Sequence, residues 1–258
     1  MNIAHNVLKL CERSHEGGRG PYPDSSVMEW RGEEIRLTYI EESPLYLRGD
    51  ELGYDPRAVV VLSKHKSEAG IPCLTVHCTG NIGDAAYGGE PRKVSVAPAQ
   101  MMKAALLELN SRTRQASLPY SVSYEVTHHG PTVNFPIIFV EIGSSEGNWR
   151  DPLAGEVVAR AALAAASAIE QDVEVKVGLG GPHYAPLFTS MTIRDGTCFG
   201  HMVSWHHLPD LDERSLAMLA ERNVGQFGGA IVDWKGLRKE KKRVISLLEN
   251  AHIRFIRI

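Results

Sequence analysis

The stretch AVVVLSKHKSEAGIPCLTVHCTGN, residues 58–81, carries the two segments that decide the fold. The first, AVVVL at 58–62, is a short β-branched run without polar alternation, which predicts a strand buried on both faces. The second, PCLTVHC at 72–78, predicts another strand that stops before the breakers Gly80 and Gly83. Together they predict a sheet in the interior of the protein.

Outward from this stretch, strand-like and helix-like patterns alternate. Residues 97–112 place Met101, Met102 and Ala105 at helical spacing behind Pro98, and Asp151 followed by Pro152 predicts the start of a helix over 151–169. Further strands are predicted at 35–40, 122–127, 136–142 and 173–177, and a polar loop at 14–32. Such alternation predicts an α/β layer protein with a largely parallel or mixed sheet. No linker divides the chain, so we expect one domain over 1–258.

Composition narrows the class of protein. With 258 residues, of which 43% are hydrophobic, the chain is long enough for one large core and too apolar for a disordered protein. No window predicts a transmembrane helix or a signal peptide, so we expect no membrane partner. The four cysteines are scattered without a CxxC pair, which is typical of free thiols in a cytoplasmic protein.

Histidines gather where predicted strands end. His77 ends one strand, His128 and His129 follow another, and His183 follows a third. In open α/β sheets the carboxyl ends of strands line the ligand crevice, so we expect these side chains in one site, with Glu141 as its carboxylate. The candidate catalytic residues are His77, His128, His129 and Glu141, and the candidate metal ligands are His77, His128, His183 and Glu141. Imidazoles with a carboxylate are a ligand set for catalytic zinc, but without an HExxH motif the spacing leaves the metal and the metal-free interpretations open.

Glycine-rich loops follow several of these strands. In HHGPT and GLGGPH the backbone N–H groups of Gly130, Gly180 and Gly181 are candidate donors to an oxyanion. The GxSxG, GxGxxG and GxxxxGK[ST] patterns are missing from the sequence, which argues against a serine hydrolase, a dinucleotide-binding protein and a P-loop protein.

Charge is divided unevenly along the chain. The formal net charge is −3, yet residues 214–258 hold ten Lys and Arg against four acids, a balance of +6 that leaves −9 for the rest. The segment DWKGLRKEKKR at 233–243 predicts a basic helix over 235–250. On such a helix Lys235, Arg238, Lys239 and Lys242 share one face, which suits either a polyanion such as a phosphate backbone or simple solvation.

Five motifs, in order, resemble the archaeal and plant type of D-aminoacyl-tRNA deacylase. They are VVVLSKHKSEAGIPCLTVHCTGN at 59–81, SYEVTHHGPT at 123–132, FVEIGSSEGNW at 139–149, GLGGPHYAP at 178–186 and DWKGL at 233–237. The resemblance implies a hydrolase that cleaves the ester between a D-amino acid and tRNA, with one or two zinc ions as cofactor. It also implies a three-layer α/β/α fold with a mixed sheet, phosphorylase/hydrolase-like and similar to peptidyl-tRNA hydrolase. We add Lys64 and Lys66 to the candidate tRNA contacts, and we expect a monomer.

The chain also departs from the family pattern. Relatives open with an additional strand, which we expect this chain, beginning at Met1, to lack. At Pro182 the family pattern has a third glycine, and proline removes an N–H donor there.

Two other functions use part of the same features. A zinc-dependent amidohydrolase or peptidase acting on a small substrate would need the histidines but not the basic end. A tRNA-binding protein without catalytic activity would need the basic end but not the histidines.

Overall fold

Two four-stranded sheets form the centre of the protein. The computed structural model describes residues 2–15, 26–169 and 172–258. The first sheet has the order β4-β10-β5-β9, with β4 at Val59–Lys64, β10 at Ile137–Gly143, β5 at Cys73–His77 and β9 at Ser121–Tyr124. The second has the order β12-β11-β14-β15, with β12 at Cys198–Val203, β11 at Glu174–Leu179, β14 at Gln226–Val232 and β15 at Phe255–Arg257. The predicted strands near 58, 72, 122, 136 and 173 are therefore confirmed, as is a mixed α/β fold.

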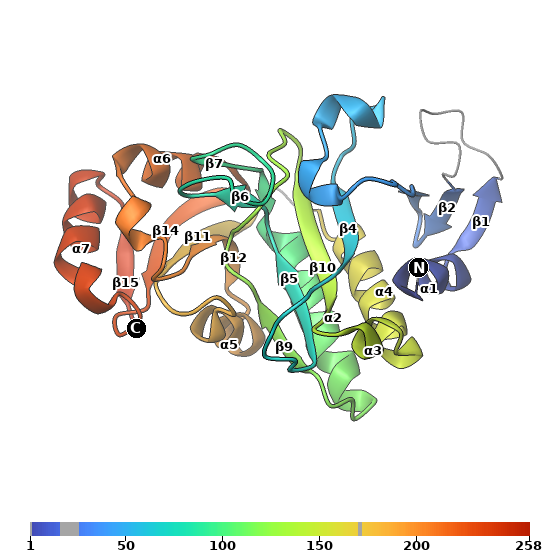
Figure 1. Ribbon diagram of the computed structural model, residues 1–258. Coiled ribbons are helices and arrows are strands. Elements are labelled where there is room, and N and C mark those ends of the chain that lie inside the picture. The colour runs from blue at the N-terminus through green and yellow to red at the C-terminus, as the bar shows by residue number, and fades with distance from the viewer. Residues whose placement is uncertain (1, 16–25, 170–171) are drawn as a thin grey trace.

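The two sheets meet edge to edge just beyond β9. The N–H of Thr127 donates to the carbonyl of Met202 in β12 at 2.8 Å, and the N–H of Val126 donates to the carbonyl of His183 at 2.9 Å. β5 is antiparallel to β10 in the first sheet, whereas every pair in the second sheet is parallel. We refer to this junction at Val126 and Thr127 as the seam, and Figure 1 shows it near the middle of the molecule.

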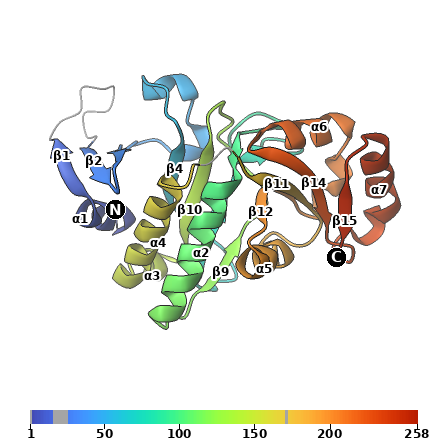
Figure 2. The same cartoon turned by 180° about the vertical axis from the view of Figure 1, so that it is seen from behind.

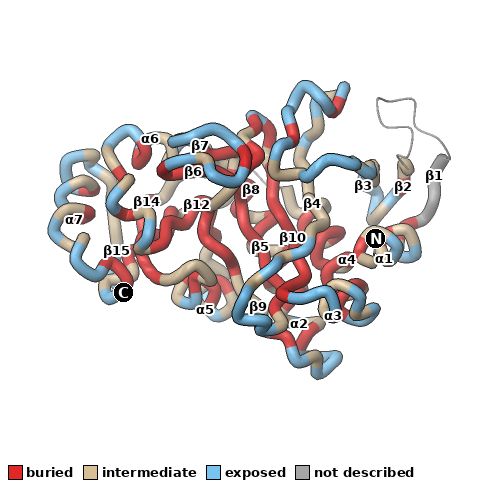
Figure 3. Tube along the Cα trace, viewed as in Figure 1, coloured by how far each residue is buried: buried red, intermediate tan, exposed pale blue. Residues whose placement is uncertain are grey.

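Helices α2 (Ala99–Gln115) and α4 (Pro152–Ala166) cover one face of the first sheet and pack against each other, as Figure 2 shows from behind. The carboxylate of Asp151 caps α4 by accepting from the N–H of Leu153 at 2.9 Å, as the sequence predicts. The predicted apolar face of α2 is buried, and β5 and β10 are buried along their length (Figure 3). The predicted burial of 58–62 on both faces is wrong, because β4 is the edge strand of the first sheet and is only half-buried. The α4 helix ends at Ala166, a turn earlier than expected.

The remaining elements flank the two sheets. On the N-terminal side lie α1 (Asn2–Leu10) and the antiparallel strands β1 (Glu12–His15), β2 (Ser26–Trp30) and β3 (Glu33–Leu37), followed by 3₁₀ turns η1 (Pro44–Tyr46) and η2 (Gly49–Leu52). The predicted polar loop at 14–32 is wrong at its end, where β2 buries Met28, and its residues 16–25 lie outside the described residues. Short pieces complete the fold: β6 (Gly80–Asn81), β7 (Lys93–Val94), β8 (Ala97–Pro98), α3 (Glu146–Trp149), α5 (Pro186–Asp195), η3 (Leu208–Asp210), α6 (Glu213–Glu221) and β13 (Asn223–Val224).

The predicted basic helix over 235–250 is wrong in its first half. The α-helix, α7, spans only Lys241–Asn250, after the 3₁₀ turn η4 (Arg238–Glu240). The chain turns before it, because the carboxylate of Asp233 accepts from the N–H of Gly236 at 2.7 Å and Arg238 adopts a left-handed φ of 52°. The basic side chains of 235–239 therefore do not continue the face of α7, which packs on the second sheet through Val244 and its apolar neighbours.

Two general expectations can be compared with the structure. All four cysteines are buried free thiols, as predicted. Among the helices of the described residues, none combines the length and apolar character needed to cross a bilayer.

Candidate functional site

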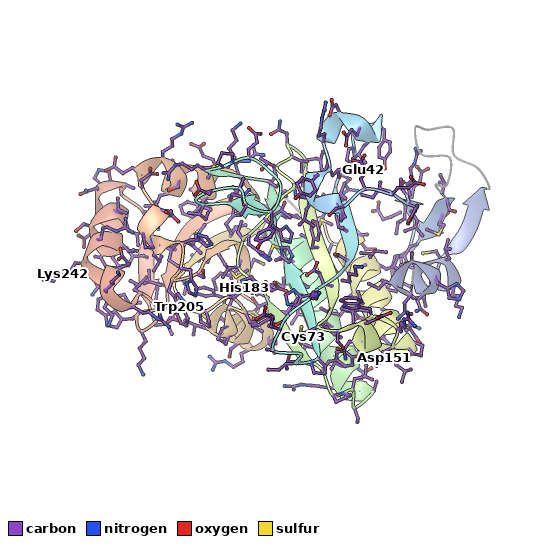
Figure 4. All side chains as sticks on the ribbon, viewed as in Figure 1. Glu42, Cys73, Asp151, His183, Trp205 and Lys242 are labelled. Atoms are coloured by element: carbon purple, nitrogen blue, oxygen red, sulfur yellow. The ribbon has the colours of Figure 1, made fainter. Side chains whose placement is uncertain are left out.

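The structure brings the predicted histidines together at the seam. The ring centroids of His77 and His128 lie 4.3 Å apart, those of His128 and His129 also 4.3 Å, and those of His128 and His183 4.6 Å. His183, labelled in Figure 4, comes from the loop after β11, and the other three come from β5 and the segment after β9. Four imidazoles from three segments of the chain therefore form one cluster.

The cluster forms on a sheet face, which differs from the expected row of carboxyl strand ends. Because β5 runs antiparallel to β10, His77 at the end of β5 lies opposite Phe139 in the middle of β10. Glu141 lies opposite Thr75, two positions further along the same pair. Successive side chains of a strand point to opposite faces, so His77 and Glu141 lie on the face away from α2 and α4.

Backbone carbonyls fix the tautomer of three of the imidazoles. The Nδ1 atoms of His77, His128 and His129 lie 3.3, 2.8 and 2.5 Å from the carbonyls of Cys78, Val126 and Gly130. In the neutral form of each ring, the nitrogen that meets the carbonyl carries the hydrogen and Nε2 carries the lone pair. Burial would lower the pKa of His77, but Glu141, with Oε2 3.8 Å from Nε2 of His77, favours the protonated form of that ring and raises its pKa. Nε2 of His77 is buried and has no hydrogen-bond partner among the described residues.

Two residues of the cluster were missed by the sequence analysis, Glu125 and His65. The carboxylate of Glu125 is fully buried and accepts from Nε2 of His183 at 2.6 Å, while Nε2 of His128 lies 3.5 Å away. Nδ1 of His65, at the end of β4, lies 3.5 Å from Glu125 and 3.6 Å from Glu141. A carboxylate directly after a predicted strand and three residues before His128 was the signal that could have identified Glu125.

The charges of the cluster are strongly perturbed. Burial alone would raise the pKa of Glu125, but the hydrogen bond from His183, together with the neighbouring imidazoles, outweighs it and lowers this pKa to about 2. Burial would also raise the pKa of Glu141, which the imidazoles of His65 and His77 hold well below its usual range. Burial lowers the pKa of His129 to about 4 and that of His128 well below its usual value. The two carboxylates are therefore ionised at neutral pH, and His128 and His129 are neutral.

The donor set fits a divalent cation. Three groups each bring their ligand atoms within 4.8 Å of one another: His77 with His128 and His129, Glu125 with His128 and His183, and His65 with Glu125 and Glu141. Buried imidazole lone pairs that face each other without a hydrogen-bond donor are unfavourable unless a cation binds them. The four ligands expected from the sequence, His77, His128, His183 and Glu141, are split among these groups and do not form one of them.

Two of the three expected oxyanion donors are already engaged. The N–H of Gly130 donates to the carbonyl of Tyr87 at 2.9 Å, and that of Gly180 donates to the carbonyl of Val203 at 2.8 Å. Neither is free to bind an oxyanion, because each peptide N–H carries one hydrogen. Gly181 lies against the turn of 233–237, where a Cβ added to Gly236 would come within 2.2 Å of its nitrogen.

Basic side chains lie on two sides of the cluster. Lys64 and Lys66 are exposed on either side of His65, and the ammonium of Lys64 lies 4.9 Å from the Trp149 ring centroid. From Lys235 to Arg257, in a part of the chain that is described throughout, only Arg243 has a carboxylate within 4.0 Å. The other seven Lys and Arg of that segment have no carboxylate of the described residues within 4.0 Å. Elsewhere in the described residues ion pairs are more frequent, for example at Arg48, Arg57, Arg92, Lys93, Arg112, Arg150 and Arg160, although exposed cations such as Lys64, Lys66 and Arg114 also have no carboxylate within 4.0 Å.

Ionised carboxylates and neutral imidazoles packed at a seam of a mixed α/β fold form a candidate centre for acid–base catalysis, which is the chemistry that many hydrolases use. Comparison with known proteins identifies the family. Residues 52–256 match the family model described as D-aminoacyl-tRNA deacylase, and the chain belongs to this family.

Individual relatives agree with this assignment. The D-aminoacyl-tRNA deacylase of Methanosarcina acetivorans is 34% identical over 90% of this chain and 80% of its own length. The D-aminoacyl-tRNA deacylase of Ignicoccus hospitalis is 35% identical over 89% of this chain and 94% of its own length. The fold is similar to the crystal structure of a conserved protein of unknown function, with a TM-score of 0.84, 30% identity and coverage of 99% of this chain and 90% of that one.

Proposed function

We propose that this protein hydrolyses the ester bond of D-aminoacyl-tRNA and releases the D-amino acid and tRNA. The observation that carries the proposal is the position of the cluster, which lies at the seam between an acidic body and a basic end where, among the described residues, only Arg243 has a carboxylate within 4.0 Å. Family membership supports the reaction and the substrate class. The likeness to peptidyl-tRNA hydrolase and the three-layer arrangement stay predictions from the sequence.

We further propose zinc as the cofactor, held by Nε2 of His77, His128 and His129. A zinc ion held by these three imidazoles would act as a Lewis acid and would lower the pKa of water to about 7. Nδ1 of His128 is bonded to the carbonyl of Val126, so only its Nε2 can bind a metal ion. An ion held by His128 with Glu125 and His183 would therefore exclude an ion held by His128 with His77 and His129. A second ion per chain is compatible only with His65, Glu125 and Glu141.

His183 is the residue that we assign to proton transfer. Its side chain is 40% exposed, and its Nε2 is held by the buried carboxylate of Glu125, so Nδ1 faces away from that carboxylate. A carboxylate that orients an imidazole in this way also stabilises the imidazolium. This assignment differs from the metal role expected for His183 from the sequence. Nε2 of His183 donates its hydrogen to Glu125 and therefore has no lone pair for a metal ion.

In the proposed reaction, His183 accepts a proton from water as the water oxygen forms a bond to the ester carbonyl carbon. The bond from that carbon to the ribose oxygen then breaks, and the proton passes from His183 to the ribose oxygen that leaves. The products are the tRNA hydroxyl and the D-amino acid, whose new carboxyl group loses its proton to the solvent. Glu125 keeps His183 in position throughout, and Glu141 and His65 form a second buried carboxylate–imidazole contact beside it.

The unpaired cations are the proposed tRNA surface. We assign Lys235, Arg238, Lys239 and Lys242, together with Lys64 and Lys66 beside His65, to contacts with phosphates. Because the basic end lies on the second sheet and the cluster at the seam, the duplex part of the tRNA would lie on the former while its 3′ end reaches the latter. We propose that a monomer suffices, since every residue of the cluster comes from one chain.

The test is incubation of the purified protein with D-tyrosyl-tRNA and L-tyrosyl-tRNA, with and without a chelator. We expect release of D-tyrosine only, and loss of this activity with the chelator. Equal cleavage of both substrates refutes chiral selection, and undiminished cleavage with the chelator refutes the zinc proposal. Binding of tRNA without any cleavage would favour the non-catalytic alternative. If the Lys239→Glu variant cleaves D-tyrosyl-tRNA at the wild-type rate, a hydrolase of small substrates is favoured.

A further inference from the structure

Trp205 and Arg238 form a stack that the proposed reaction does not use. The guanidinium carbon of Arg238 lies 3.3 Å from the Trp205 ring centroid, and Arg238 is exposed on its other side. No carboxylate of the described residues lies within 4.0 Å of this guanidinium. Trp205 packs against the core of the second sheet, so the indole fixes the plane of the guanidinium.

The stack lies next to the loop that carries His183. The backbone N–H of Trp205 donates to the carbonyl of Gly181 at 3.0 Å, and Gly181 lies two residues before His183. In Figure 4 Trp205 lies between His183 and Lys242 of the basic end. The stack therefore links the basic end, through Arg238, to the loop that carries His183, through Trp205.

The backbone of Arg238 is held in an unfavourable conformation. Its φ is 52°, a region that disfavours residues with a Cβ. The turn before it is pressed against the GGPH loop so closely that a Cβ on Gly236 would come within 2.2 Å of Gly181 N. Strained residues of this kind persist where the surroundings determine them and are common at ligand clamps. The position of Arg238 is thus fixed from the backbone as well as from the indole.

We propose that Arg238, stacked on Trp205, binds a backbone phosphate of the unpaired 3′ end of the tRNA and guides that end toward His183. A planar guanidinium with free N–H groups donates two parallel hydrogen bonds to a phosphate. Stacking of a base on Trp205 is less compatible with the structure, because the core packs against this indole and Arg238 covers it. The inference rests on the proposed function, since it names how that substrate is held.

Arg238→Lys is the deciding variant, since it keeps the charge and removes the planar fork. Its affinity for uncharged tRNA, measured by fluorescence anisotropy, should fall about tenfold. Trp205→Leu should show a similar loss, with circular dichroism to verify its fold. Arg114→Lys, an exposed arginine at the end of α2, is the matched control and should bind as the wild type does.

Cleavage of two substrates separates this inference from the proposed function. D-tyrosyl-tRNA should be cleaved about tenfold less efficiently by Arg238→Lys, whereas D-tyrosyl-adenosine, which has no phosphate, should be cleaved as by the wild type. Unchanged tRNA affinity in Arg238→Lys, or an equal loss on both substrates, overturns the inference. If the wild type cleaves neither substrate the proposed function fails, and the anisotropy measurement still decides whether Arg238 binds phosphate.

Discussion

Replacing Glu125 by glutamine should remove most of the activity without weakening tRNA binding. The carboxylate of Glu125 is fully buried and 2.6 Å from Nε2 of His183, where it is ionised at neutral pH. When His183 takes up a proton, a carboxylate and an imidazolium face each other with charge centres about 4 Å apart, worth about 4 kcal/mol at an effective dielectric of 20. Glutamine keeps the size and one acceptor oxygen but removes this attraction, which stabilises the transition state.

The expected loss follows from that energy. A full 4 kcal/mol corresponds to about a 10³-fold fall in kcat, and a retained neutral hydrogen bond reduces it to between about 10² and 10³. KM for D-tyrosyl-tRNA should change less than about twofold, because the buried side chain does not reach RNA. The assay is steady-state release of D-tyrosine, with anisotropy of uncharged tRNA measured in parallel.

Two further variants make this result interpretable. Glu174→Gln removes an exposed carboxylate paired with Lys176 and should leave kcat unchanged. Glu125→Asp keeps the charge and should retain more activity than glutamine, provided that thermal melting shows both variants folded. A kcat within threefold of the wild type in folded Glu125→Gln would refute the role of His183 as the proton carrier.

Three other outcomes follow from the structure. His129→Asn should lower zinc affinity by at least about 100-fold in a chelator competition, because it removes a proposed ligand; unchanged affinity would assign zinc to another set. Charge reversal at Lys239 and Lys242 should reduce the dependence of log Kd on log salt concentration by about 1 for each lost phosphate contact, and an unaltered slope would exclude both residues from the interface. Burial lowers the pKa of His201 to about 4, below the unfolded value of about 6.5, so stability should be complete above pH 6.5 and decrease by up to about 3 kcal/mol as the pH falls to 4. Denaturant unfolding of His201→Gln should show a weaker decrease, and an identical pH dependence would contradict this origin.

Strands and long helices could be predicted because their signals are local. The β-branched run at 58–62 and the apolar spacing around Met101 depend on neighbours in sequence, and both elements formed where expected. The start of α7 could not be predicted in this way. The helix is prevented before Lys241 by a turn that packs against the GGPH loop, some fifty residues earlier in the chain.

The residues of the cluster were predictable in part for the same reason. Histidines at strand ends were visible in the sequence, but the partner of each one depends on strand direction. Only the antiparallel pairing of β5 with β10 places Glu141 near His77, 3.8 Å between Oε2 and Nε2. Glu125 and His65 can be recognised as site residues only from their contact with each other, which joins segments that are far apart in the sequence. Gly130 is not an available donor because its N–H is bonded to the carbonyl of Tyr87, which the sequence does not reveal.

The seam explains why acidic and basic parts of one chain can serve a single reaction. A polyanionic substrate would be repelled by a body that carries −9 if the cluster lay in the middle of it. Thr127 and Met202 join the two sheets at their edges, so His128 follows immediately at the border of the second sheet, whose far side carries the unpaired cations. The phosphates can therefore remain on the basic end while only the aminoacylated 3′ end enters the acidic body, and this arrangement requires the site to lie at the seam.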